Sequence, residues 1–405
     1  MSENAFAFDR WIRGPFVAMN SALEELYFAQ TDRANVDGVG DDIKRSLRDE
    51  GHRHVVALWH EGNTGDGFET AFGVLGNVGL YLAALRRHEL TNPAREQRSP
   101  FREASSLAMH VGASIGMAPR FATAHLATRN FAVAGVRKSF TNLADEFLFI
   151  DENTRGILCF QQAAEALGRV PAIGVSNPAA DVLFTAAAEA LRGAFAVNAR
   201  LFEQLDVNRF FYSVRPYYKP YRVGRLEYRG ANAGDFSGIN EIDLLLGLCH
   251  ANDPYYGQLL VDKMLFMVPD DQSRLRDCMR HRNLLDEFLA LADAHADAPW
   301  FQRNATLFLE VCDLFAATAR QHHDQLVNRF ITAPAENMDA KHLSALTASG
   351  PSLETLLQAL AILRDYRVAA ADRPDLETRH HDLKRLRTLC RLPCPAEPTG
   401  SPTRH

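Results

Sequence analysis

Residues 301–331 read FQRNATLFLEVCDLFAATARQHHDQLVNRFI, and their apolar positions recur every three or four residues. One stripe runs through Leu309, Cys312, Ala316, Ala319, His323, Leu326 and Phe330. This spacing predicts an amphipathic helix with one face toward a core. His323 lies within the stripe, whereas His322 falls about 100° away on the wetter side. An inward histidine either hydrogen-bonds to a carbonyl or offers a ring nitrogen to a metal or cofactor, and the spacing leaves both open.

The composition is that of a soluble protein with a large core. The chain has 405 residues, of which 47% are hydrophobic and 23% charged, and this length suggests more than one domain. The net charge of −6 and the scattered basic residues indicate neither a nucleic-acid nor a membrane partner. We find no apolar run of about 18–20 residues and no secretory signal. Six dispersed cysteines favour reduced thiols, so we expect a cytoplasmic protein.

Helical spacing also dominates the rest of the chain. Alanine- and leucine-rich segments with this spacing cover 15–30, 68–91, 155–169, 178–205, 255–268, 283–294, 301–331, 352–367 and 375–390. The one plausible strand is HVVALWH at 54–60, which would place His52, His54 and His60 on one face, either as metal ligands or as a solvated edge. Because strand patterns are scarce, we predict an all-α fold rather than a parallel α/β sheet.

A polar stretch separates the N-terminal third from a longer helical part. It contains Asp145, Asp151, Glu152 and Asn153, and it reads as a loop. We therefore predict a small, mainly helical N-terminal domain over 1–148 and a large all-helical domain over 149–391. The proline-containing residues 392–405 are expected to form a disordered tail.

The chain between residues 206 and 238 is irregular and rich in aromatic residues. Phe210 and Phe211, followed by Arg215, could form an apolar slot with one fixed cation at its edge. That combination suits an aromatic amino acid, whose ring would be buried while its carboxylate meets the guanidinium. A solvated arginine beside core phenylalanines is the alternative. The small residues of 230–238 would let a planar group approach the backbone closely, or would serve tight helix packing.

Together these segments resemble the haem-dependent aromatic oxygenase superfamily, specifically indoleamine 2,3-dioxygenase and monodechloroaminopyrrolnitrin synthase. The resemblance extends from about residue 155 to residue 367. HDQLVNRFI, beginning at His323, looks like the segment that carries the dioxygenase's proximal haem ligand. The resemblance therefore implies that His323, and not His322, binds the iron of haem b. Phe210, Phe211 and Arg215 match the substrate-pocket aromatics and the carboxylate-binding arginine.

The resemblance implies roles for further residues. Ala233, Gly234 and Ser237 look like the small-residue loop of the haem pocket, and Ser349 with Gly350 looks like the loop that closes over substrate. Pro351 makes that loop stiffer than in the dioxygenase. On the distal side of the haem, which the N-terminal domain would cover, the dioxygenase has phenylalanines and a serine. Here Ile157 offers less aromatic bulk, and the Gln161 amide could hydrogen-bond to oxygen or substrate.

The function implied is a haem-dependent oxygenase acting on L-tryptophan or a substituted tryptophan, with dioxygenase-type insertion of oxygen at the indole C2–C3 bond. Two alternatives remain. One is an indole ring rearrangement in secondary metabolism, like that of the pyrrolnitrin enzyme, and the other is a non-catalytic haem-binding helical protein. The expected partners are an aromatic amino acid and dioxygen, without nucleic acid or membrane, and a homodimer is left open.

Overall fold

The structure is a computed structural model, and it describes residues 1–62, 67–231, 234–325, 329, 353–371, 373 and 375–393. Within these ranges the chain is predominantly helical, which confirms the predicted all-α class. The strands present are β1 (Tyr221–Val223) and β2 (Leu226–Tyr228), which pair antiparallel as a short hairpin.

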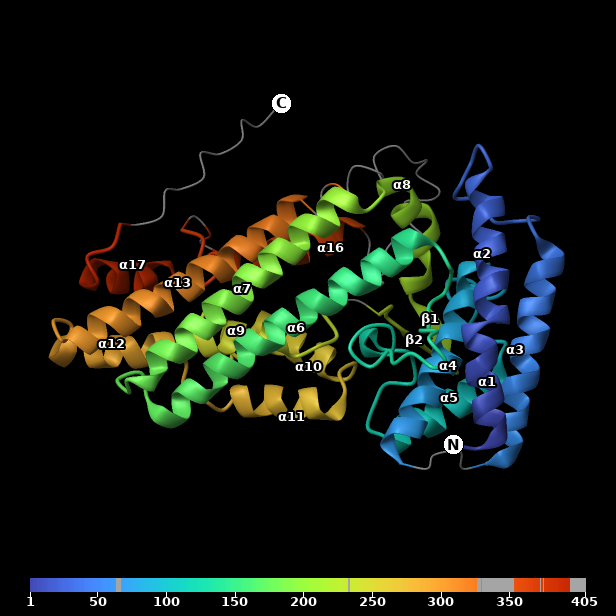
Figure 1. The fold of residues 1–405 in the computed structure, drawn as a ribbon, viewed down its shortest axis with the longest axis horizontal. Coiled ribbons are helices and arrows are strands. Elements are labelled where there is room, and N and C mark those ends of the chain that lie inside the picture. The colour runs from blue at the N-terminus through green and yellow to red at the C-terminus, as the bar shows by residue number, and fades with distance from the viewer. Residues whose placement is uncertain are drawn as a thin grey trace.

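The N-terminal helices form one group at one end of the molecule (Figure 1). They are α1 (Glu3–Arg13), α2 (Pro15–Phe28), α3 (Asp41–Glu61), α4 (Phe68–Arg87) and α5 (Arg102–Ser114). α4 packs against α1, α3 and α5, so most of its surface is covered by protein. Its length and composition would suffice to cross a membrane, but 78% of the apolar window is buried inside the protein. α4 is therefore packed as a core helix.

The second group of helices is built around three long ones that run side by side in Figure 1. These are α6 (Ala144–Ile173), α7 (Ala179–Gln204) and α13 (Pro299–Gln321). Shorter helices pack around them, namely α9 (Gly238–Leu246), α10 (Pro254–Met264), α11 (Pro269–Cys278), α12 (Leu284–His295), α16 (Leu353–Arg367) and α17 (His380–Leu389).

The buried side chains form two main hydrophobic clusters. The first combines the N-terminal helices with residues from the irregular segment, for example Tyr217, whose ring stacks on Phe140 at 4.4 Å between centroids. The second lies among α6, α7, α9, α12, α13 and α17. α6 contributes Ile150 to the first cluster and Ala163 to the second. This helix therefore connects the two cores, and the irregular segment lies between the two groups of helices (Figure 1).

The loop predicted around residues 145–153 is wrong, because α6 already begins at Ala144. Its acidic residues are helical and paired rather than solvated. Asp151 forms an ion pair with Arg137, and Glu152 forms one with Arg200 at 3.1 Å. Acidic side chains in a first turn also stabilise a helix through its dipole. The sequence does not show that Arg137 and Arg200 pair with these acids. A cluster of apparently unpaired acidic residues therefore predicted a solvated loop. The domain division at residue 148 stays a prediction.

The strand predicted over 54–60 is also wrong, since these residues belong to α3. In a helix, His52, His54 and His60 do not share one face. The ring of His54 instead lies 5.6 Å from that of Phe8 and packs into the first cluster. Among the described residues, no group of three histidine, cysteine or acidic side chains is arranged to hold a metal ion. The metal site that depended on the strand is therefore contradicted.

The glycines of α4 give a direct test of this packing. A Cβ atom on Gly79 would lie 2.3 Å from the backbone nitrogen of Phe121, whereas one on Gly73 would meet nothing within 4 Å. Gly79→Ala should therefore lower the free energy of unfolding by about 1–3 kcal/mol. Gly73→Ala, in the same helix, should raise it by about 1 kcal/mol through helix propensity. Urea denaturation measures both values, and equal shifts for the two variants would contradict the close contact of α4 with Phe121.

Candidate active site

A cavity of about 430 Å³ lies where α6 passes α11 and the segment that joins α5 to α6. Its wall includes Ile157, Leu158, Gln161, Phe131, Asp235 and Phe236. Ile157 and Gln161 are one helical turn apart on α6, so both face the same side. Ile157 is buried and Gln161 is half-buried. The structure therefore brings the two predicted distal residues to one cavity whose size is typical of ligand pockets.

Asp235 is a wall residue that the sequence did not single out. Its carboxylate is buried and accepts from Arg120 at 2.7 Å and from Arg229 at 2.9 Å. Arg120 comes from the N-terminal part and is itself buried, so this pair joins the two groups of helices at the cavity. A buried carboxylate held by two guanidinium groups is an orienting element rather than a free acid. In the sequence, Asp235 stands out only as one acidic residue within a run of small residues. The two arginines that bind it cannot be identified from the sequence.

The small residues before α9 are explained in part by close packing. A Cβ atom on Gly238 would lie 3.2 Å from backbone atoms of Phe160 and Gln161, so the start of α9 is pressed against α6. Ser237 is buried at that point, and its N–H donates to Asp271 at 3.2 Å. Of the other residues predicted to line a haem pocket, Gly234 lies in the turn before α9 and Ala233 lies outside the described residues.

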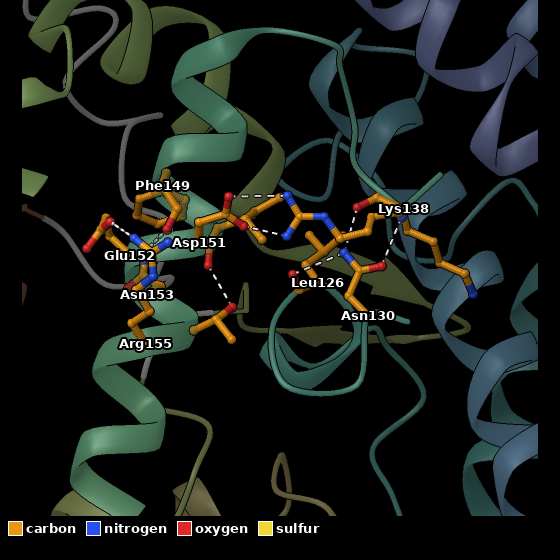
Figure 2. Close-up of polar contacts among 11 residues, drawn as sticks. Leu126, Asn130, Lys138, Phe149, Asp151, Glu152, Asn153 and Arg155 are labelled. Atoms are coloured by element: carbon orange, nitrogen blue, oxygen red, sulfur yellow. Dashed lines mark hydrogen bonds and ion pairs between the residues drawn. The ribbon is translucent and has the colours of Figure 1, made fainter. Parts of the chain in front are cut away.

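A compact loop lies beside α6 (Figure 2), and three of its residues, Thr128, Arg129 and Phe131, line the cavity. The Asn130 side chain closes this loop, since it donates to the carbonyls of Leu126 and Lys138 at 3.2 and 2.7 Å and accepts from the Lys138 N–H at 2.8 Å. The Arg137–Asp151 ion pair attaches the loop to α6. Phe131 within it lines the cavity while 69% exposed. Phe131 thus adds an apolar side chain to a cavity edge whose loop is held to α6 by the ion pair.

The predicted substrate slot lies in two irregular turns. Phe210–Val214 is a π-helical turn and Arg215–Tyr218 a 3₁₀ turn, and π-helical turns are frequent at functional sites. Phe210 and Phe211 are buried, and the guanidinium carbon of Arg215 lies 5.5 Å from the ring centroid of Phe211. The cation and the ring of Phe211 therefore lie together as predicted, while the ring of Phe210 packs against Phe149 of α6.

Arg215 is 6% exposed and, within the described part of the chain, its side chain makes no ion pair or hydrogen bond. Burial lowers the pKa of its guanidinium to about 10, which still leaves it charged at neutral pH. Buried charges in proteins are normally paired, because an unpaired charge removed from water destabilises the fold. The solvated arginine considered as an alternative is therefore contradicted.

The slot and the cavity are related through α6. The ring of Phe149 lies 4.9 Å from that of Phe210, and Ile157 follows eight positions later, about 12 Å along the helix. Within the described residues, the wall of the cavity does not include Phe210, Phe211 or Arg215. The predicted slot residues and the predicted distal residues thus both lie next to α6. Among the described residues, they do not line the same pocket.

The histidine pair follows the end of α13. The α-helix predicted over 301–331 ends at Gln321 and continues as a π-helical turn over 322–325. His323 is half-buried, and its buried Nδ1 has no hydrogen-bond partner among the described residues. His322 has an exposed surface, yet burial and the nearby Arg367 lower its pKa to about 4.

Charged residues of α16 lie beside this turn. Arg367, next to His322, binds Asp243 of α9 through two hydrogen bonds of 2.9 and 2.8 Å. The hydroxyl of Tyr256 donates to the same carboxylate at 2.7 Å. The histidine turn is thus connected to α9, whose first residue contacts α6. Ser349 and Gly350, the predicted closing loop, lie outside the described residues.

Comparison with known families agrees with the motifs. No curated protein matches the chain. The model of the family described as monodechloroaminopyrrolnitrin synthase PrnB matches residues 2–390, which includes the N-terminal third that the motifs did not reach. With nearly the whole chain covered, the protein belongs to the monodechloroaminopyrrolnitrin synthase family of enzymes.

Proposed function

We propose that this protein is a haem-dependent oxygenase that acts on L-tryptophan or a substituted tryptophan. The observation that carries the proposal is Arg215, a buried cation that has no acidic partner among the described residues and lies beside the ring of Phe211. The carboxylate of an aromatic amino acid would pair with this cation, and its ring would pack against the apolar wall. The family to which the chain belongs supports the same class of reaction.

His323 is the residue proposed to bind haem b, and its surroundings fit that role. Burial and Arg364 lower its pKa, so the ring is neutral at pH 7 and has a lone pair available. Its buried Nδ1 lacks a partner, and the ring makes no hydrogen bond within the described part of the chain. When bound, the haem iron supplies the binding and activation of dioxygen.

The remaining residues would position the substrate and exclude water. Arg215 would hold the carboxylate through two parallel hydrogen bonds, which fixes orientation as well as affinity. Phe210 and Phe211 would cover the indole ring. Gln161 would donate its amide hydrogen toward the ligand from α6, and Ile157 would leave room for a substituted ring. Such positioning matters, because a displacement of about 1 Å can slow a reaction about 100-fold.

The reaction itself has two candidate forms. The first is insertion of both oxygen atoms at the indole C2–C3 bond. The second is a ring rearrangement as in pyrrolnitrin biosynthesis, and the match to that family over residues 2–390 favours it as a candidate. The two forms share the proposed substrate contacts and differ in the product.

The assignment of His323 predicts different outcomes for the two adjacent histidines. His323→Ala should lose stoichiometric haem, because the alanine has no lone pair for the iron, whereas His322→Ala should retain it. The haem-to-protein ratio from the Soret absorbance measures this, and circular dichroism checks that both variants are folded. The opposite pattern would show that His322 is the ligand.

The role of Arg215 predicts opposite effects on binding and stability. Arg215→Leu should keep haem but weaken binding of L-tryptophan more than tenfold, or about 1.4 kcal/mol. Without ligand it should be at least as stable as the wild type, because a buried unpaired charge is removed. Soret titration and urea denaturation measure the two effects, with the exposed Arg225→Leu as the matched control. Unchanged binding would remove Arg215 from the site.

The product distinguishes the two reactions. Ferrous protein should convert at least one member of a panel of indole amino acids under isotopically labelled dioxygen, with the product analysed by mass spectrometry. A ring-opened product that carries both labelled atoms supports insertion, and a rearranged ring without that pair supports the second reaction. Haem binding without any product from the panel would contradict both and indicate a non-catalytic protein.

A further inference from the structure

Two N-terminal helices pack against the turns that carry Phe211 and Arg215. α2 contacts the π-helical turn Phe210–Val214, and α4 contacts the 3₁₀ turn Arg215–Tyr218. None of the residues assigned to substrate or haem comes from either helix. What these helices contribute at the turns is found in their polar contacts with the backbone.

The backbone carbonyl of Tyr212 lacks the donor that a helix would supply. In an α-helix it would accept from the N–H four residues later, but residue 216 is a proline and has no N–H. The N–H of Arg215, at the end of the π-helical turn, bonds to the carbonyl of Phe210 instead. Nη2 of Arg87, near the end of α4, donates to the Tyr212 carbonyl at 2.9 Å. A side chain from a distant helix thus satisfies a backbone group of the turn.

Glu24 of α2 fixes the orientation of Arg87. Nε and Nη2 of Arg87 donate to the two carboxylate oxygens of Glu24 at 2.8 and 2.9 Å. Both side chains are buried, with 6% of Arg87 and none of Glu24 exposed. A pair joined by two parallel hydrogen bonds fixes the plane of the guanidinium as well as its position. Glu24, Arg87 and the carbonyl of Tyr212 therefore form one continuous, buried link from α2 through α4 to the turn.

A second ion pair joins α2 to the chain just before the π-helical turn. Arg209 binds Glu25 at 2.9 Å, but 56% of the Glu25 side chain is exposed. Exposed ion pairs stabilise little, because water and salt compete with them. The buried pair at Glu24 is therefore the stronger constraint on the turn, and Glu25 offers a neighbouring residue for comparison.

We propose that Glu24 and Arg87 are positioning residues for the substrate's carboxylate. Arg87 holds the backbone at Tyr212, three residues before Arg215, and thereby sets where the Arg215 guanidinium lies beside the ring of Phe211. Because the Arg215 side chain makes no ion pair or hydrogen bond in the described part of the chain, its backbone has to place it. This inference rests on the proposed function and adds the residues that orient its carboxylate contact.

A double variant removes this link without leaving a buried charge unpaired. Glu24→Gln/Arg87→Met deletes both charges and the donor to Tyr212, and proteins tolerate loss of a whole buried pair better than loss of one partner. Glu25→Gln, on the same helix, is the matched control for an exposed pair. Circular dichroism and the haem-to-protein ratio check that each holoenzyme is folded and loaded.

Hydrogen exchange, followed by mass spectrometry without ligand, reports on the turn itself. Amide exchange over residues 210–219 should rise in the double variant and stay at the wild-type level in α13, because only the turn loses a fixed point. Glu25→Gln should match the wild type in both segments. Unchanged exchange over 210–219 would overturn the inference. An equal rise in α13 would show general destabilisation and would overturn it too.

Ligand binding tests whether the link serves the carboxylate. L-Tryptophan should bind the double variant about tenfold more weakly, because the Arg215 guanidinium is no longer held for two parallel hydrogen bonds. Any binding of indole, which lacks the carboxylate, should be the same as in the wild type. Isothermal calorimetry on the holoenzymes measures both affinities. An equal weakening of the two ligands would show a structural role and overturn the proposal.

A thermodynamic cycle tests whether the pair acts through Arg215. Once Arg215 is removed, loss of the pair should cost no further affinity. Glu24→Gln/Arg87→Met/Arg215→Leu should therefore bind L-tryptophan as Arg215→Leu alone does. A further tenfold loss in the triple variant would show an independent effect and contradict the positioning role.

The same measurements separate this inference from the proposed function. If the double variant binds L-tryptophan like the wild type while Arg215→Leu does not, the inference alone fails. If Arg215→Leu also binds L-tryptophan normally, the proposed function fails and the inference falls with it.

Discussion

The burial of Arg215 without a carboxylate partner in the described part of the chain is the constraint on which the candidate site depends. An unpaired guanidinium removed from water destabilises the fold, so other packing has to hold its turn in place. Aromatic contacts with the N-terminal part supply that packing. Tyr217 stacks on Phe140 at 4.4 Å, and Tyr221 lies parallel to Phe121 at 6.4 Å between centroids. The segment that joins α5 to α6 therefore shapes the site, although it carries none of the predicted ligand-binding residues.

α6 is the element that gives the site its geometry. Its first turns are fixed by ion pairs with Arg137 and Arg200, its Phe149 contacts the substrate slot, and its Ile157 and Gln161 face the cavity. Because a helix is a rigid spacer of about 1.5 Å per residue, the slot and the cavity are held at a set separation. A change in the ion pairs at the start of α6 would shift both.

The sequence allowed prediction of features that depend on local spacing. Helical periodicity identified the all-α class, and the spacing of Phe211 and Arg215 identified a ring and a cation that lie together in the structure. Features that depend on distant partners were not predictable. Asp235 gains its role from Arg120, 115 residues away, and the acids of α6 read as a loop for the same reason. The π-helical turn after Gln321 interrupts a periodicity that had predicted a longer α-helix.

α9 contacts α6 beside the cavity at one end and an arginine near the histidine turn at the other. At its first residue, Gly238 lets the helix approach α6 beside Gln161, since any Cβ there would meet the backbone at 3.2 Å. Within the same helix, Asp243 holds Arg367 next to His322. Asp243 is fully buried, so its two hydrogen bonds to Arg367 compensate a desolvated charge and resist displacement. α9 is held at Gly238 and at Asp243, so it sets the distance between the α6 surface that carries Gln161 and the histidine turn. This distance would decide whether a planar cofactor bound to His323 could contact a ligand held by α6.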